Sequence, residues 1–243
     1  MQELNESYKI IFVGDSGTGK TSIINSYFEI STVKIIKDKD SNLNIPAPTI
    51  GASQLTIYHK NVALRIWDTA GQENYRAILP LYFKNSSLAI IAFDISNRTS
   101  FDHLTKDART KPNSDQNETN IKKTDLFESG SWIDLVAQYA PKECKIIIVG
   151  NKSDLQNKRQ VSASEGENLV KKINTFYQKE TFEKALFYIE TSTIDNSNIY
   201  DLFDQAFESK DCLIKKYVSQ DFLPNDENNK TTENNDKQGS GCC

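Results

Sequence analysis

A glycine-rich segment, Gly14-Asp15-Ser16-Gly17-Thr18-Gly19-Lys20-Thr21, constrains the fold of this chain more than any other feature. It follows an apolar run at residues 8–13 and precedes a helical pattern over residues 21–28. Strand, glycine loop and helix in this order are the context that a phosphate-binding loop of the form Gly-x4-Gly-Lys-Thr requires. The glycines let backbone N–H groups surround a phosphate, and the start of the helix adds a favourable dipole. We predict that residues 15–22, through Ser22, bind phosphates, with Lys20 on the terminal phosphates and the Thr21 hydroxyl on Mg²⁺.

The remaining sequence alternates strand and helix patterns. Five further apolar or alternating runs predict strands at 54–58, 62–67, 88–93, 145–149 and 185–189. The first two of these predict an antiparallel hairpin, because only His59-Lys60-Asn61 separates them. Helical patterns lie at 72–84, 132–139, 163–179 and 199–208. We therefore predict an α/β fold with a six-stranded, mostly parallel sheet, one antiparallel strand and helices on both faces.

Composition and charge exclude several classes of protein. The formal net charge of -4 gives no basic footprint for nucleic acid. No run of about 18 apolar residues predicts a membrane-spanning helix, residues 1–7 do not form a signal peptide, and Gln2 excludes N-myristoylation. Cys144 opens an apolar run and is expected to be a buried thiol, with a reducing compartment as the default.

Three polar, irregular stretches interrupt the alternating pattern, at residues 31–47, 105–131 and 219–240. We predict one domain over residues 8–216 with insertions near 31–47, 105–131 and 171–183. Residues 1–7 then form an N-terminal extension. Residues 217–243 form a polar, disordered tail.

A second motif, Asp68-Thr69-Ala70-Gly71-Gln72, follows the second strand of the predicted hairpin. An acid at the end of a strand is placed to hold Mg²⁺ through water, and the N–H of Gly71 can reach a terminal phosphate. The pattern Asp-x-x-Gly is common and weak by itself. Its position after a phosphate loop makes it a more specific signal of a Mg²⁺ and phosphate site.

The third motif, Asn151-Lys152-Ser153-Asp154, follows the strand at 145–149 and distinguishes between purines. The Asp154 carboxylate can accept two hydrogen bonds from the N1–H and the exocyclic amine of guanine. Adenine offers no such pair of donors, so the acid would lack partners against ATP. The alternative is an Asx-turn that closes a strand.

Together with Thr49, these motifs resemble the Ras superfamily over residues 8–210. Three segments resemble its Rab family: Thr49-Ile50-Gly51, Ile66-Trp67-Asp68-Thr69-Ala70-Gly71-Gln72-Glu73 and Gly241-Cys242-Cys243. The resemblance implies a G domain of the P-loop NTPase fold. It also implies a monomeric GTP hydrolase that cycles between GDP and GTP states, hydrolyses slowly without an activating protein, and regulates vesicle-mediated membrane and protein transport.

The resemblance also assigns roles to single residues. Thr49 would join Thr21 and Asp68 as a Mg²⁺ ligand and would sense the γ-phosphate. Gly71 would act as the pivot of switch II, and Gln72 would orient the attacking water as the catalytic residue. The residues of the last base-contacting loop would be Ser192 and Thr193.

Two terminal cysteines, Cys242 and Cys243, imply double prenylation in this resemblance. Two lipid chains anchor stably where one is marginal, and the tail carries no polybasic second signal. The expected location is the cytoplasmic face of intracellular membranes with a cytosolic pool, and residues 79–83 resemble those of endosomal members. The expected partners are an exchange factor, a GTPase-activating protein, a prenyl-chaperone and effectors that contact switches I and II.

The sequence departs from the family at four places. Lys20 and Thr49 are 29 residues apart, about ten more than in Ras-like proteins. The aromatic that packs on guanine would fall at Thr32, so faster nucleotide exchange is expected. Ile194 replaces a lysine in the last base loop, and Gln54 replaces an aromatic of the Rab effector surface.

Two other functions stay open on the sequence. A P-loop ATPase or kinase would use the same phosphate loop, and only residues 151–154 argue against it. A degenerate Rab-like scaffold with altered exchange or little hydrolysis would keep the motifs. The longer switch I segment and the missing aromatic keep this second alternative open.

Overall fold

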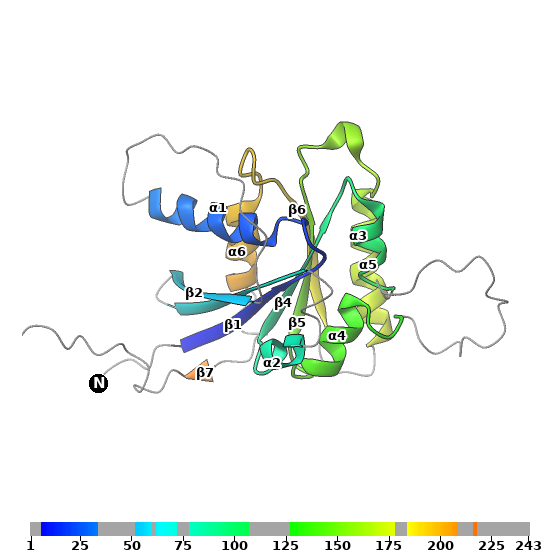
Figure 1. Cartoon of the computed structure of the whole chain (residues 1–243). Helices are drawn as coiled ribbons and strands as arrows, with labels where there is room; N and C mark the ends of the chain where they lie inside the picture. The colour runs from blue at the N-terminus through cyan, green and yellow to red at the C-terminus, as the bar shows by residue number, and fades with distance from the viewer. Residues whose placement is uncertain are drawn as a thin grey trace, which may run out of the picture.

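The computed structural model describes residues 6–33, 52–59, 62–71, 78–106, 127–177, 184–208 and 216–217. Its strands form one sheet in the order β2-β3-β1-β4-β5-β6, and a short seventh strand pairs with β1 (Figure 1). The strands are β1 (Glu6–Val13), β2 (Ala52–His59), β3 (Val62–Thr69), β4 (Leu88–Asp94), β5 (Lys145–Asn151), β6 (Ala185–Thr191) and β7 (Lys216–Tyr217).

Helices cover both faces of this sheet, as Figure 1 shows. One face carries α1 (Lys20–Val33) and α6 (Ile199–Glu208). The other face carries α2 (Leu79–Phe83), α3 (Arg98–Asp102), α4 (Trp132–Tyr139) and α5 (Ala163–Phe176), and a 3-10 turn, η2 (Gln156–Lys158), follows β5.

The pairing of the strands matches the predicted pattern. β2 and β3 are antiparallel, from Ala52 opposite Thr69 to His59 opposite Val62. β1 is parallel to both β3 and β4, and β5 is parallel to both β4 and β6. The predicted fold class, a mostly parallel six-stranded sheet with one antiparallel strand and helices on both faces, is therefore confirmed, and the two-residue β7 adds a short antiparallel pairing to β1.

Two apolar clusters form the core, one on each face of the sheet. They arise because alternate residues of β1 point to opposite sides: Tyr8, Ile10 and Phe12 belong to one cluster, Ile11 and Val13 to the other. Every residue of β4 and of β5 is buried, as expected for central strands covered on both faces. The sheet is therefore held firmly from both sides, and its carboxyl edge is a rigid base for loops.

Several boundaries differ from those predicted. β1 begins at Glu6, and its first two residues pair with β7, because the pairing of β1 with β4 starts only at Ile10. α1 continues past residue 28 to Val33, since no glycine or proline lies between them to end it. α3 was not predicted; five residues are too few for a helical period, and its signal is the cap Asn97, whose side chain accepts from the N–H groups of Thr99 and Ser100.

Parts of the three predicted insertions, the ends of the predicted helices at 72–84 and 163–179, and almost all of the predicted tail lie outside the described residues. Among the residues that are described, no helix has both the length and the apolar character needed to cross a membrane.

Candidate functional site: a phosphate loop joined to two base loops

The phosphate loop connects β1 to α1 at the carboxyl edge of the sheet, and its glycines permit close backbone contacts. A Cβ on Gly14, whose φ is 132°, would lie 2.1 Å from the carbonyl oxygen of Ala92 in β4. A Cβ on Gly19, whose φ is 91°, would lie 2.2 Å from Nδ2 of Asn151. Both positions therefore require glycine for space and for backbone conformation, and the loop fits tightly against β4 and the end of β5.

Lys20 begins α1 and turns back over the loop. Its Nζ donates to the carbonyls of Gly14 at 2.9 Å and Asp15 at 2.8 Å, and the side chain is buried. Burial lowers the pKa of Lys20 to about 8, against the opposing effect of Asp68 and Asp15. The ammonium thus lies on two backbone carbonyls of the loop, where a phosphate oxygen would improve its solvation.

Thr21 and Asp68 are brought together from α1 and the end of β3. The Thr21 hydroxyl donates to Oδ2 of Asp68 at 2.5 Å, and Asp68 is 5% exposed. The neighbouring Thr69 donates to the carbonyl of Phe12 at 2.6 Å and fixes the end of β3 to β1. A hydroxyl and a buried carboxylate are hard oxygen ligands of the kind that Mg²⁺ uses together with phosphates, so this pair fits that ion.

Gly71 lies directly against the phosphate loop. A Cβ on it would fall 2.4 Å from the carbonyl carbon of Asp15 and from the backbone nitrogen of Ser16. The structure thus places this predicted switch residue on the Asp15–Ser16 peptide. A larger residue would displace one of the two segments.

Asn151, at the end of β5, joins the phosphate loop to the base loops. It is 1% exposed, its Nδ2 donates to the carbonyl of Thr18 at 2.9 Å, and its Oδ1 accepts from the Thr191 hydroxyl at 3.0 Å. Three segments far apart in sequence therefore meet at one buried amide.

Lys152 follows with a left-handed backbone, φ 63°, and its Nζ lies 2.7 Å from Oδ2 of Asp94 at the end of β4. Oδ1 of Asp94 accepts from the backbone N–H of Ser96 at 2.8 Å and from its hydroxyl at 2.6 Å. Burial opposes ionisation of Asp94, but hydrogen bonds from Lys152 and Ser96 hold its pKa below the ordinary value. Asp94 therefore fixes the position of the Lys152 stem.

The two predicted base loops contact each other. The Ser192 hydroxyl donates to Oδ1 of the exposed Asp154 at 2.7 Å, and the N–H of Ser153 donates to the carbonyl of Thr191 at 3.0 Å. The Ile194 N–H donates to the Ser192 hydroxyl at 3.2 Å, so the loop closes on itself without the lysine of the family. Thr193 lies within this loop. Asp154 thus presents its second carboxylate oxygen beside the loop.

An ion pair between Arg159 and Glu190 stabilises the last base loop. Arg159 donates to both carboxylate oxygens of Glu190, at 2.7 and 2.6 Å, and the Tyr188 hydroxyl donates to the same carboxylate at 2.8 Å. Burial opposes ionisation, but these bonds keep the pKa of Glu190 below its ordinary value. Glu190 is therefore engaged at the end of β6 and supports the loop from behind.

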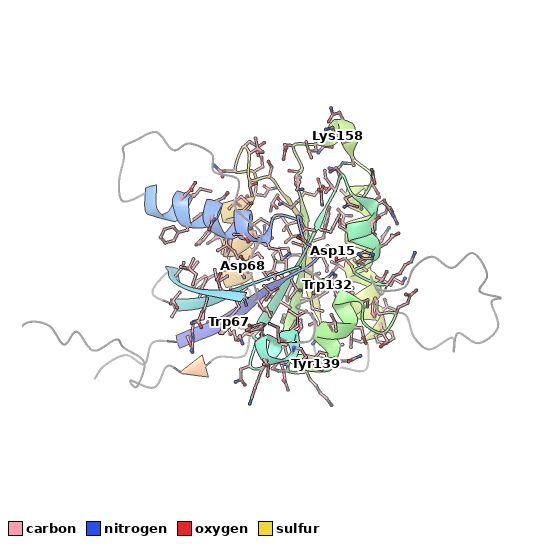
Figure 2. All side chains as sticks on the ribbon, in the orientation of Figure 1. Asp15, Trp67, Asp68, Trp132, Tyr139 and Lys158 are labelled. Carbon is pink, nitrogen blue, oxygen red and sulfur yellow. The ribbon has the colours of Figure 1, made fainter. Side chains whose placement is uncertain are left out.

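The Asp15 carboxylate is held by two residues that the sequence did not indicate. Oδ1 accepts from Nε1 of Trp132 at 2.8 Å (Figure 2). Oδ2 lies 2.5 Å from Nδ1 of His103. Asp94 was missed in the same way. Asp94 directly follows a predicted strand and Trp132 begins a predicted helix, but such positions are too common to identify a partner, and His103 adjoins no predicted element.

The structure brings together most of the predicted site residues, namely those of the phosphate loop, Asp68, Gly71 and the two base loops. Four predicted residues lie outside the described part of the chain: Thr49, Gln72, Cys242 and Cys243. Their roles stay predictions.

Comparison with known protein families gives a match to the Ras family over residues 9–123 and 119–211. The two matched segments meet between α3 and α4, inside the stretch at 105–131 that the sequence marked as an insertion. Members of this family are small GTPases that bind GTP and GDP, typically with Mg²⁺, and interact with exchange factors, activating proteins and effectors. Because the match spans most of the chain and coincides with the phosphate loop and base loops described above, the chain belongs to the Ras family.

Proposed function

We propose that this protein is a Rab-type GTPase that binds GDP and GTP, hydrolyses GTP, and regulates vesicle-mediated membrane and protein transport. The observation that carries the nucleotide assignment is the buried Asn151 amide, which joins the phosphate loop to the loop bearing Asp154. The Asn151 amide thus holds the phosphate loop at a fixed distance from the loop that carries the Asp154 carboxylate, which suits guanine. ATP would leave Asp154 without its two donors.

GTP hydrolysis needs little covalent chemistry from the protein, because phosphoryl transfer depends on positioning and charge stabilisation. Lys20 and the loop N–H groups would hold the phosphates. Thr21 and Asp68, with Thr49, would hold Mg²⁺, which when bound neutralises charge on the phosphate oxygens. Gln72 would orient the attacking water, and Gly71, against the Asp15–Ser16 peptide, would transmit the state of the phosphate to the switch.

The Rab assignment rests on sequence motifs and on one surface feature. The rings of Trp67 and Tyr82 lie 5.4 Å apart, and Lys9 lies over the Trp67 ring at 4.5 Å. Both rings are only partly buried, so they offer an aromatic surface to effectors. Gln54 replaces the third aromatic of that surface and is exposed, so the effectors should differ from those of close relatives.

Membrane attachment would come from geranylgeranyl groups on Cys242 and Cys243, delivered with a prenyl-chaperone. We propose that the protein lies on the cytoplasmic face of intracellular membranes, endosomal membranes among them, in exchange with a cytosolic pool. A tagged full-length chain and its Cys242→Ser/Cys243→Ser form, imaged side by side, test this: loss of membrane signal in the double variant is expected. Equal membrane signal in both would refute prenyl anchoring.

One finding supports a second possibility, a Rab-like scaffold with altered exchange. α1 continues through Thr32, where the family places the aromatic that packs on guanine. Stacking on a base is worth about 1–3 kcal/mol in single-stranded complexes, so GDP release about tenfold faster than is usual in the family is expected. A GDP release rate in the ordinary slow range would exclude this.

Two measurements on the full-length protein test the main proposal. The first is the identity of the co-purified nucleotide, followed by ATP and GTP competition, and the second is GTP turnover in wild type and in Gln72→Leu. Retention of guanine nucleotide, exclusion of ATP and loss of turnover in Gln72→Leu are expected. Binding of ATP as tightly as GTP would refute the assignment, and guanine binding without any turnover would favour the scaffold.

A further inference from the structure

Asp15 places a negative charge on a loop whose proposed ligand is itself a polyanion. Its carboxylate is turned to the side of α3 and α4, where Trp132 and His103 hold one oxygen each. The indole N–H can only donate, and an ionised carboxylate can only accept. With the Asp15 carboxylate ionised, the tautomer that suits this contact has its proton on Nδ1 of His103.

The two donors come from the two sides of the segment between α3 and α4, and backbone bonds tie those sides together. The N–H of Trp132 donates to the carbonyl of His103 at 3.1 Å, and the N–H of Ile133 donates to Leu104 at 3.1 Å. The N–H of Glu128 donates to Thr105 at 2.8 Å. These backbone hydrogen bonds therefore hold His103 and Trp132 at a fixed separation beside the phosphate loop.

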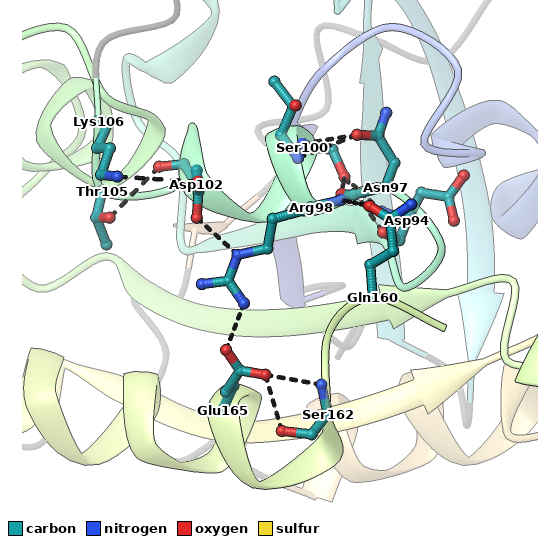
Figure 3. Close-up of polar contacts among 11 residues, drawn as sticks. Asp94, Asn97, Arg98, Ser100, Asp102, Thr105, Lys106, Gln160, Ser162 and Glu165 are labelled. Atoms are coloured by element: carbon teal, nitrogen blue, oxygen red, sulfur yellow. Dashed lines mark hydrogen bonds and ion pairs between the residues drawn. The ribbon is translucent and has the colours of Figure 1, made fainter. Parts of the chain in front are cut away.

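Both donors are themselves held in place. Trp132 is fully buried at the start of α4. His103 is the C-cap that follows α3, and Figure 3 shows how that short helix is fixed by contacts of Arg98. Arg98 contacts Asp102 within α3 and Glu165 of α5, and its backbone N–H donates to Gln160 at 2.9 Å.

The backbone of Asp15 is central to the proposed site. Its carbonyl accepts from Nζ of Lys20 at 2.8 Å and from the Thr18 hydroxyl at 2.9 Å. The peptide between Asp15 and Ser16 is the surface on which Gly71 rests. A change in the direction of the Asp15 side chain would therefore move the groups that hold phosphate and the contact with switch II.

We propose that His103 and Trp132 are positioning residues for the phosphate loop, acting through the Asp15 carboxylate. They draw its charge away from the nucleotide phosphates and fix the Asp15–Ser16 peptide. This inference rests on the proposed function, since it names two further residues that control nucleotide retention at that same site.

Release of a fluorescent GDP analogue from the full-length protein tests the inference. Trp132→Phe removes one donor and keeps a buried ring, His103→Ala removes the other, and His103→Asn restores an amide N–H near the position of Nδ1. A hydrogen bond to a charged group contributes enough that each loss should speed release at least about fivefold. His103→Asn should stay within about twofold of wild type.

A double-mutant cycle separates positioning from general loss of stability. In an Asp15→Ala background, Trp132→Phe and His103→Ala should add little, because residues that act through one group are not additive. The control is Asp134→Ala, which removes a carboxylate in the first turn of α4 that accepts from Gly130 and Gln138 and has no contact with Asp15. Its thermal midpoint should fall without faster release.

Two results would overturn the inference. The first is that Trp132→Phe and His103→Ala speed GDP release equally in the wild-type and Asp15→Ala backgrounds. The second is that GDP release speeds up in proportion to the loss of thermal midpoint in all variants, Asp134→Ala included. Failure of wild type to bind guanine nucleotide is a different outcome. It would refute the proposed function itself.

Discussion

Replacing Asn151 by alanine tests the junction on which the site depends. The side chain is 1% exposed and makes one hydrogen bond to the Thr18 carbonyl and one to the Thr191 hydroxyl. Asn151→Ala leaves both of these groups buried without that partner. Each such loss costs about 1–3 kcal/mol, so the free energy of unfolding should fall by about 2–6 kcal/mol.

The same change should weaken nucleotide binding, because the phosphate loop and the Asp154 loop would no longer be held at a fixed separation. A loss of about 1.4 kcal/mol is a factor of ten in affinity, and at least that loss is expected for GDP. Urea unfolding at one fixed excess of GDP measures stability, since bound ligand shifts the transition. Release of a fluorescent GDP analogue measures retention.

Two variants serve as references for Asn151→Ala. Asn157→Ala changes an exposed asparagine of η2 on the same connection and should alter stability by less than about 0.5 kcal/mol. Thr191→Val removes the hydroxyl alone and should give about half of the loss. If Asn151→Ala unfolds at the urea concentration of Asn157→Ala, the junction contributes nothing and the reasoning is refuted.

Three further predictions follow from single groups. Asp94→Asn removes the negative charge 2.7 Å from Nζ of Lys152, so GDP release measured by stopped flow should be about three to ten times faster. An unchanged rate would contradict the role of Asp94 in positioning Lys152. Burial gives Lys20 a pKa of about 8, whereas a bound phosphate favours the charged form of the lysine. Above about pH 8 nucleotide binding therefore takes up a proton, and GDP affinity should fall as the pH rises. Calorimetry that finds a constant affinity from pH 7 to 10 would refute this. Cys144 is fully buried, and burial raises its pKa to about 12, so iodoacetamide near neutral pH should leave it unmodified until denaturant is added, as peptide mass spectrometry can check.

The sheet and the main motifs were predictable because each has a local signal. β4 and β5 are continuous apolar runs, which is the pattern of strands buried on both faces. The phosphate loop requires glycine at Gly14 and Gly19 for close backbone contacts, so the requirement is written directly in the sequence. The predicted start and end of α4 and α6 agree with the structure, since each has an apolar stripe of helical period.

The remaining features have no local signal. The bonds from His103 and Trp132 to Asp15 join residues 88 and 117 positions apart, and neither a histidine nor a tryptophan indicates its partner by spacing. β7 has two residues and depends on the part of β1 that β4 leaves unpaired. Such contacts come from the tertiary arrangement of the chain, which periodicity does not encode.

The phosphate loop and the base loops cannot act independently in this arrangement. The Asp15 carbonyl accepts from the Thr18 hydroxyl, and the Thr18 carbonyl accepts from Asn151, which also accepts from Thr191. A displacement of Asp15 would therefore reach the loop of Asp154 through a continuous series of hydrogen bonds. Asp15→Ala keeps that backbone carbonyl but releases the segment from Trp132 and His103, and Asn151→Ala removes the next link of the series. Both changes act on the same series, so their combined effect on GDP release should be smaller than the product of the two separate effects.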